Sequence, residues 1–251
     1  MSIVERTRSL FHLKSGPVDH NGSIPAGHIA QPVCATTRVE NVDFDFYDSY
    51  TKDLGAPVEG LQAHIALVND DGIVTFTFWT RADLSRQYFG DVLSRAVQEV
   101  IACGSQRGDF IRDHSSVLTL WLGKGATSCV AHNTADVLRS RTFLRTTCFA
   151  LAGADAQEAR QLVDAIYSVA EVGLALQREL LLHATLFAED GSCKTLDLWS
   201  DEAAGRRFTE DHLRPAFEKL LSPEELQSVV NECAQARVFW VSEGQLDQLL
   251  Y

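Results

Sequence analysis

The feature that most constrains the fold of this chain is an internal repeat with a period of about 120 residues. Five landmark positions of the first half recur in the second half, four at a separation of 119 residues and one at 120. The pairs are His64 and His183, Gly72 and Gly191, Phe89 and Phe208, Trp121 and Trp240, and Trp79 and Trp199. A self-match of this length indicates two domain-sized copies, because solenoid repeats are only about 20 to 50 residues long.

The pattern of elements is the same in both halves and predicts the order β-α-β-β-α-β, the ferredoxin-like unit of an α+β fold. In the first half we expect strands at 33–39, 60–68, 73–79 and 117–122, and helices at 44–54 and 84–101. In the second half we expect strands at 142–151, 180–188, 193–199 and 237–242, and helices at 155–170, 202–221 and from 223. Asp155 and Ser222 are expected N-caps, and Pro215 should interrupt the long helix.

The domain organisation follows from this pattern. We expect an irregular N-terminal arm at residues 1–30, because its glycines and prolines show little periodicity. The first ferredoxin-like unit should span 31–123 and the second 141–251, with a linker at 124–140.

The two hairpins predict which side chains share a face of each sheet. A two-residue turn at 71–72 would place His64 opposite Trp79, and a turn at 190–192 would place His183 opposite Trp199. The second turn is expected to hold Gly191 in a left-handed conformation.

Each hairpin then has one mixed face and one apolar face. The mixed faces carry His64, Thr75, Thr77 and Trp79 in the first half, and His183, Thr185, Thr195, Asp197 and Trp199 in the second. The apolar faces carry Leu61, Ile65, Leu67, Phe76 and Phe78, and Leu182, Ala184, Leu186, Leu196 and Leu198. We expect the apolar faces to lie under each unit's own helices and the mixed faces to meet between the two sheets.

The composition excludes several classes of function. A formal charge of −12 with scattered basic residues disfavours nucleic acid and anionic membranes as partners. The sequence shows no signal peptide and no membrane span, so a cytoplasmic location is expected. The six cysteines lack C-x-x-C spacing, so no metal site is predicted, and no P-loop, nucleophile elbow or dinucleotide fingerprint is present.

Residues 191–220 resemble a known family. The Asp-Gly turn, Thr195-Leu196-Asp197-Leu198-Trp199-Ser200, Phe208 and Leu213-Arg214-Pro215-Ala216 look like the antibiotic-biosynthesis-monooxygenase group of the dimeric α/β-barrel superfamily. In that superfamily two ferredoxin-like units pack sheet to sheet as a barrel, usually across a dimer and sometimes within one duplicated chain. The resemblance implies a barrel inside this single chain, with any homodimer built on its outer surfaces.

The resemblance leaves several functions open, because this fold supports many activities. It favours an enzyme similar to the cofactor-independent monooxygenases and cyclases, which would remove a proton next to a carbonyl of a hydrophobic, aromatic or polyketide-like substrate. The rival is a non-catalytic binding or scaffold protein. The third hypothesis is haem binding, although the iron-binding histidine of the haem-degrading branch would fall near Glu218 or Gln98, and only His212 could replace it.

The candidate site is placed in the second half. Asp197 replaces Thr77 of the first half, and a carboxylate removed from water can act as a general base. We therefore predict Asp197 or His183 as the base. The side chains expected to contact the substrate are Trp199, Trp240, His64, Trp79 and Trp121. The alternative is structural, with the histidines stacked on the tryptophans and the tryptophans forming core.

Overall fold

The computed structural model describes the chain in segments. The described residues are 32–40, 42, 45, 47, 58–69, 72–93, 110–123, 142–151, 155–170, 177–188 and 190–241. The expected N-terminal arm at 1–30, the linker at 124–140 and most of the expected helix at 44–54 lie outside these residues.

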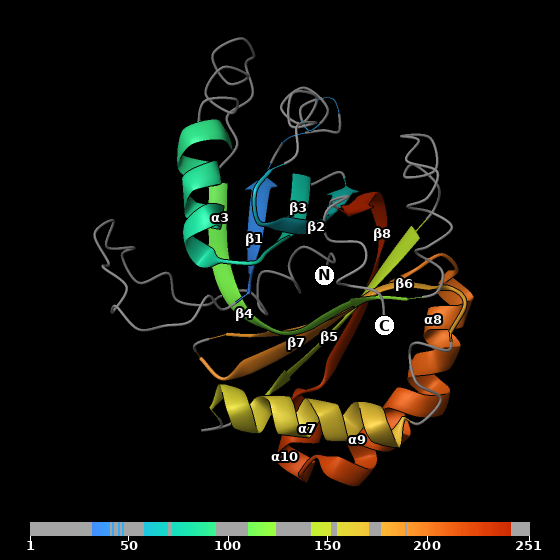
Figure 1. The fold of residues 1–251 in the computed structure, drawn as a ribbon. Coiled ribbons are helices and arrows are strands. Elements are labelled where there is room, and N and C mark those ends of the chain that lie inside the picture. Colours follow the sequence, from blue (N-terminus) through green and yellow to red (C-terminus); the bar gives the residue numbers. More distant parts are fainter. Residues whose placement is uncertain are drawn as a thin grey trace.

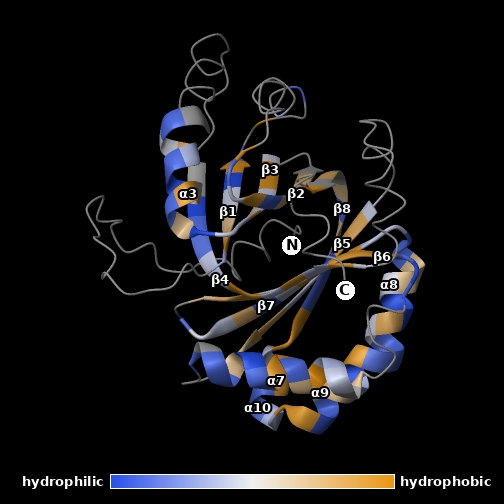
Figure 2. Cartoon of the chain, in the orientation of Figure 1, coloured by the Kyte–Doolittle hydropathy of each residue, from blue (hydrophilic) through white to orange (hydrophobic). Residues whose placement is uncertain are grey.

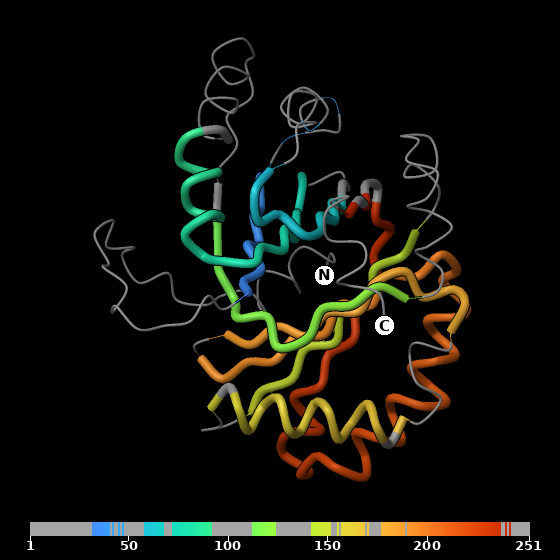
Figure 3. The backbone as a smooth tube through the Cα atoms, viewed as in Figure 1, coloured from blue at the N-terminus to red at the C-terminus, as the bar shows by residue number. Residues whose placement is uncertain are grey.

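Eight strands form one closed barrel, as Figure 1 and the backbone trace in Figure 3 show. The strands are β1 (Val33–Glu40), β2 (Leu61–Asn69), β3 (Gly72–Trp79), β4 (Phe110–Leu122), β5 (Thr142–Ala150), β6 (Leu180–Phe187), β7 (Ser192–Trp199) and β8 (Val230–Val241). Their order around the barrel is β1-β3-β2-β8-β5-β7-β6-β4, so each half of the chain supplies four neighbouring strands. The mixture of strands and helices confirms the α+β class.

The helices lie outside the barrel (Figure 1). They are α3 (Ala82–Tyr88) with the π-helix η1 (Phe89–Leu93), α7 (Ala156–Val169), α8 (Glu202–Phe208) with the π-helix η3 (Thr209–Leu213), α9 (Arg214–Leu220) and α10 (Pro223–Ser228). Figure 2 shows hydrophobic and hydrophilic residues alternating along them, as expected for helices with one buried face. None of the described helices combines the length and apolarity of a membrane span.

Local sequence signals determine where the helices of the second half begin and end. Asp155 and Ser222 each form a capping box, with Glu158 and Glu225 respectively, so both predicted N-caps are confirmed. Pro215 lies in the first turn of α9, directly after the π-helix η3, so the predicted interruption is confirmed. The helix expected at 202–221 thus consists of three consecutive helical segments, α8, η3 and α9.

The last strand of each half is longer than predicted and joins the two halves. β4 pairs with β1 through Phe110–Ser116 and with β6 of the second half through Ser116–Leu122. β8 pairs in the same way with β5 and then with β2 of the first half. These two crossings close the barrel and leave none of the eight strands with an unpaired edge.

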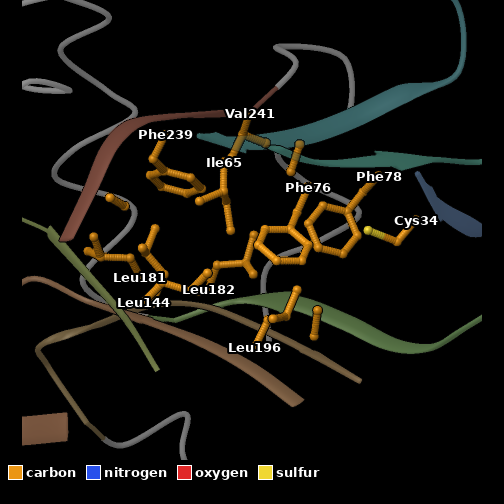
Figure 4. Packing of buried hydrophobic residues seen from close by; sticks show 14 of the residues in the cluster. Cys34, Ile65, Phe76, Phe78, Leu144, Leu181, Leu182, Leu196, Phe239 and Val241 are labelled. Carbon is orange, nitrogen blue, oxygen red and sulfur yellow. The ribbon is translucent and has the colours of Figure 1, made fainter. Parts of the chain in front are cut away.

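The apolar faces of the hairpins fill the barrel lumen, so the prediction that they lie under the helices is wrong. One buried cluster draws side chains from all eight strands, including Cys34, Ile65, Phe76, Val117, Leu144, Leu182, Leu196 and Phe239. Figure 4 shows Ile65, Phe76 and Phe239 pointing toward Leu144, Leu182 and Leu196 on the facing strands. Apolar side chains are favoured in the lumen because the backbone groups of the surrounding strands already bond to one another. A polar side chain there would find few hydrogen-bond partners.

The mixed faces therefore lie under the helices. Trp199 packs in a cluster with side chains of α7, α8 and α9, and Trp79 packs in a cluster with Phe89 of η1. Helix side chains can offer hydrogen-bonding groups to the polar residues of these faces, which the lumen cannot do.

The strand pairing within each hairpin differs from the prediction. His64 lies opposite Thr77, and His183 lies opposite Asp197, instead of opposite the two tryptophans. Gly191 in the turn of the second hairpin is left-handed as expected, with φ of 81°. A β-bulge between Leu61 and Ala63 also moves Leu61 from the lumen face to the helix side.

Gly205 of α8 supports the indole of Trp199, which is completely buried. A Cβ at Gly205 would lie 2.9 Å from Cδ1 of the Trp199 ring. We expect Gly205→Ala to lower the free energy of unfolding by about 1–2 kcal/mol, because the overpacking outweighs the gain in helix propensity. Urea unfolding followed by circular dichroism measures the difference.

Gly90 of η1 provides the matched control. A Cβ there meets no atom within 4 Å, so Gly90→Ala should leave stability unchanged or raise it by up to about 1 kcal/mol. Equal effects of the two substitutions would contradict the close packing of Trp199 on α8.

Candidate functional site

A buried His–Asp pair lies between the sheet and the helices of the second half. Nδ1 of His183 on β6 is 2.6 Å from Oδ1 of Asp197 on β7. The two residues are cross-strand partners, and His183 and Asp197 are only 2% and 3% exposed. A carboxylate oxygen accepts a hydrogen bond from the ring N–H, so Nδ1 of His183 is the donor toward Asp197 and Nε2 is the nitrogen not engaged by the carboxylate.

The Nε2 atom of His183 has only long hydrogen bonds. It lies 3.4 Å from the hydroxyl oxygen of Thr119 on β4 and 3.3 Å from that of Thr185 on β6. These distances are at the outer limit for a bond to a hydroxyl group. Nε2 of His183 is therefore only weakly hydrogen-bonded to the protein.

Two aromatic rings enclose the imidazole of His183. The Trp121 ring on β4 lies 5.1 Å from it between centroids, and the Tyr167 ring on α7 lies 4.5 Å from it edge to face. Burial, with a further contribution from the charge of Asp197, raises the pKa of Tyr167 well above its usual value. The Tyr167 hydroxyl therefore stays protonated and can serve as a hydrogen-bond donor.

Tyr167 carries no motif, and sequence reasoning did not include it in the site. Its hydroxyl, the hydroxyl of Thr195 and Nε1 of Trp199 are buried and make no hydrogen bond of standard geometry with the described residues, although the neighbouring Thr195 hydroxyl acts against burial to lower the pKa of Tyr167. The signal that could have found Tyr167 is its spacing, because Tyr47 precedes it by 120 residues.

The first half has a counterpart of this site in which both ring nitrogens of the histidine lie close to hydroxyl groups. Nε2 of His64 is 2.7 Å from the Tyr47 hydroxyl, and Nδ1 of His64 is 3.1 Å from the Thr77 hydroxyl. Thr77 cannot supply the negative charge that Asp197 provides in the second half. Burial lowers the pKa of His64 to about 4, so this ring is neutral at pH 7.

The structure distributes the predicted tryptophans between the two halves. Trp199 is buried in the second half against Phe208, at 5.6 Å between ring centroids, and Trp79 is buried in the first half. Trp240 lies opposite His64 in the β2–β8 ladder, whereas Trp121 lies opposite His183. The predicted grouping of Trp240 with His183 is therefore wrong, because each final strand crosses to the other half.

The residues considered for haem lie apart from the His–Asp pair. Glu218 is exposed and pairs with Arg214, and the His212 ring lies tilted against the Phe208 ring, with 5.6 Å between centroids. Gln98 lies outside the described residues. Among the described side chains, no three His, Cys, Asp or Glu residues gather as a metal site would require.

Similarity to known proteins is found in structure. No family model and no curated protein matches the chain. The "putative monooxygenase from Lactobacillus acidophilus NCFM" superposes with a TM-score of 0.58 at 8% identity, covering 84% of this chain and 97% of that one. A "Putative monooxygenase (FN1347)" from Fusobacterium nucleatum gives 0.58 at 10% identity, covering 86% and 95%.

The chain has the fold of the dimeric α/β-barrel superfamily. The fold that the sequence resemblance implied is thereby confirmed. At these identities the likeness concerns the backbone alone, so the activity of the chain has to be argued from its own side chains.

The buried His64 makes stability depend on pH. Its pKa of about 4 in the folded protein lies below the value of about 6.5 in the unfolded chain. The unfolded state therefore binds more protons between these values, and stability should fall as the pH drops from 6.5 toward 4, by up to about 3 kcal/mol. Urea unfolding at pH 7 and pH 5 measures this loss.

The source of the effect can be isolated by two measurements. In His64→Gln the difference in stability between pH 7 and pH 5 should shrink. An NMR titration should show the His64 ring unprotonated at pH 5.5, and a midpoint near 6.5 would contradict the assignment.

Proposed function

We propose that the chain is a small-molecule enzyme that removes a proton next to a carbonyl group of an apolar, aromatic or polyketide-like substrate. The observation that carries this proposal is the buried hydrogen bond of 2.6 Å between His183 and Asp197. His183 is the general base, and Asp197 fixes its tautomer and stabilises the imidazolium that forms. His183 is chosen over Asp197 as the base because Asp197 is engaged with Nδ1 of His183, which leaves Nε2 of the ring for the substrate.

The surroundings of the pair suit such a substrate. Trp121 and Tyr167 give the imidazole aromatic neighbours, and apolar side chains of the same core lie around them. The buried hydroxyls of Tyr167 and Thr195 lie near each other, and each has a proton that it could donate to the oxygen on which negative charge develops. The proposed chemistry needs no cofactor, as in the cofactor-independent monooxygenases that the sequence resembles.

The packed lumen is the observation that favours the rival function, a non-catalytic binding or scaffold protein. Apolar side chains from all eight strands fill the barrel, so a substrate between the two sheets is not supported. The proposed site lies outside the barrel, under α7 and α8, and the lumen therefore does not decide between the two functions.

We also infer that the barrel arose from two tandem ferredoxin-like units, residues 31–123 and 141–251. The strand orders β4-β1-β3-β2 and β8-β5-β7-β6 correspond between the halves. The segments α3–η1 and α8–η3 begin and end 120 residues apart, and both contain a π-helix.

Proton abstraction can be measured without knowing the natural substrate. We expect the purified full-length protein in D2O to accelerate deuterium uptake by an enolisable aryl ketone, such as 2-tetralone, as followed by mass spectrometry. His183→Ala and Asp197→Asn should reduce the rate by a factor of about 10² to 10⁴, because they remove the base or its orienting partner.

His64→Ala is the matched control, since His64 is the counterpart in the half that lacks the carboxylate. Its rate should stay within about twofold of the unaltered protein. Exchange that persists in His183→Ala would refute the site. A folded protein that accelerates exchange in none of a panel of aryl ketones would favour the scaffold hypothesis.

A further inference from the structure

Two buried polar groups in the first half face each other without partners. Thr37 of β1 and Arg112 of β4 are directly opposite in the β1–β4 ladder, on the side of the sheet that faces the helices. The Thr37 hydroxyl oxygen and Nε of Arg112 are both buried, and neither has a hydrogen bond. Buried polar atoms are rarely left in this state, so an acceptor that the described residues do not supply is expected here.

The second half shows what a satisfied version of this position looks like. Thr147 is the cross-strand partner of Thr195, as Thr37 is of Thr75, and so it occupies the same place in its sheet. Thr147 lies opposite Asn231 and donates a hydrogen bond of 2.7 Å to its Oδ1. Arg112 replaces that amide with a group that only donates, so the first half lacks the acceptor.

The guanidinium of Arg112 also lacks a counterion. Its Cζ lies 3.4 Å from the centroid of the Phe89 ring, a cation–π contact. Within the described part of the chain, no carboxylate lies within ion-pair distance of it. Burial lowers the pKa of Arg112 to about 10, so it remains charged at pH 7 and its charge is uncompensated.

Further hydrogen-bond donors lie near Arg112, on the side toward solvent. His114 follows Arg112 on the same face of β4, and its Nε2 is 3.4 Å from the hydroxyl of the buried Ser85 on α3. Partial burial, with the charges of Arg112 and Arg86, lowers the pKa of His114 to about 4. The local charge is therefore positive, and His114 and Arg86 are themselves exposed to solvent.

We propose that Arg112, Thr37, His114 and Ser85 form a binding site for an oxyanion, a carboxylate or phosphate group, between β1, β4 and α3. The oxyanion accepts hydrogen bonds from Nε of Arg112 and from the Thr37 hydroxyl, and it neutralises the guanidinium. This site is in the first half of the chain and does not depend on the chemistry of His183.

Isothermal titration calorimetry of the full-length protein with inorganic phosphate and, separately, with benzoate tests the proposal at constant ionic strength. At least one of the two anions should bind. Affinity for phosphate alone identifies a phosphate site, and affinity for benzoate alone identifies a carboxylate site. In Arg112→Gln the dissociation constant should rise by about tenfold or more, because a charge-assisted hydrogen bond and the counter-charge are lost.

A second variant distinguishes loss of the anion site from misfolding of Arg112→Gln. Thr37→Val keeps the shape of the strand residue and should also weaken binding, whereas Arg206→Gln, which removes an exposed charge of α8, should leave binding unchanged. NMR should show the pKa of His114 rising when the anion binds, because the anion opposes the charges of Arg112 and Arg86. Absence of binding to both anions, or equal binding by Arg112→Gln, would overturn the proposal and leave water as the missing acceptor.

Discussion

The whole structure depends on two β-ladders that join the halves, β4 with β6 and β2 with β8. Each half contributes a four-stranded sheet, and alone such a sheet would expose an edge and an apolar face. The crossing of β4 and β8 removes both problems at once, because it pairs the edges and brings the two apolar faces together. The lumen is therefore a shared core of both halves.

Closure of the barrel also determines where chemistry can occur. With the apolar faces turned inward, the polar residues of β6 and β7 are left beneath the helices, where Tyr167 reaches His183 from α7. The same arrangement exists in the first half with Tyr47 and His64. The difference between the halves comes from single residues on equivalent strands: Asp197 instead of Thr77, and Arg112 instead of Asn231.

Much of the fold could be predicted from the sequence, because periodicity and capping residues act locally. Strands such as β1 and β6, the Asp155 cap and the break before Pro215 were predicted within one or two residues. The first parts of β4 and β8 could not be, since residues 110–116 are largely polar and residues 230–236 lack a regular alternation of apolar and polar residues. Both segments become strands by pairing with β1 and β5. The choice of Trp121 over Trp240 as neighbour of His183 likewise depends on contacts between distant strands.

The strand β4 has a consequence for how the two halves can vary. It provides Arg112 to the first half and Thr119 and Trp121 to the surroundings of His183 in the second half. In an assembly of two identical chains, any substitution in this strand would alter both places together. In this single chain β4 and β8 are different sequences, so the surroundings of His64 and of His183 can change independently of each other.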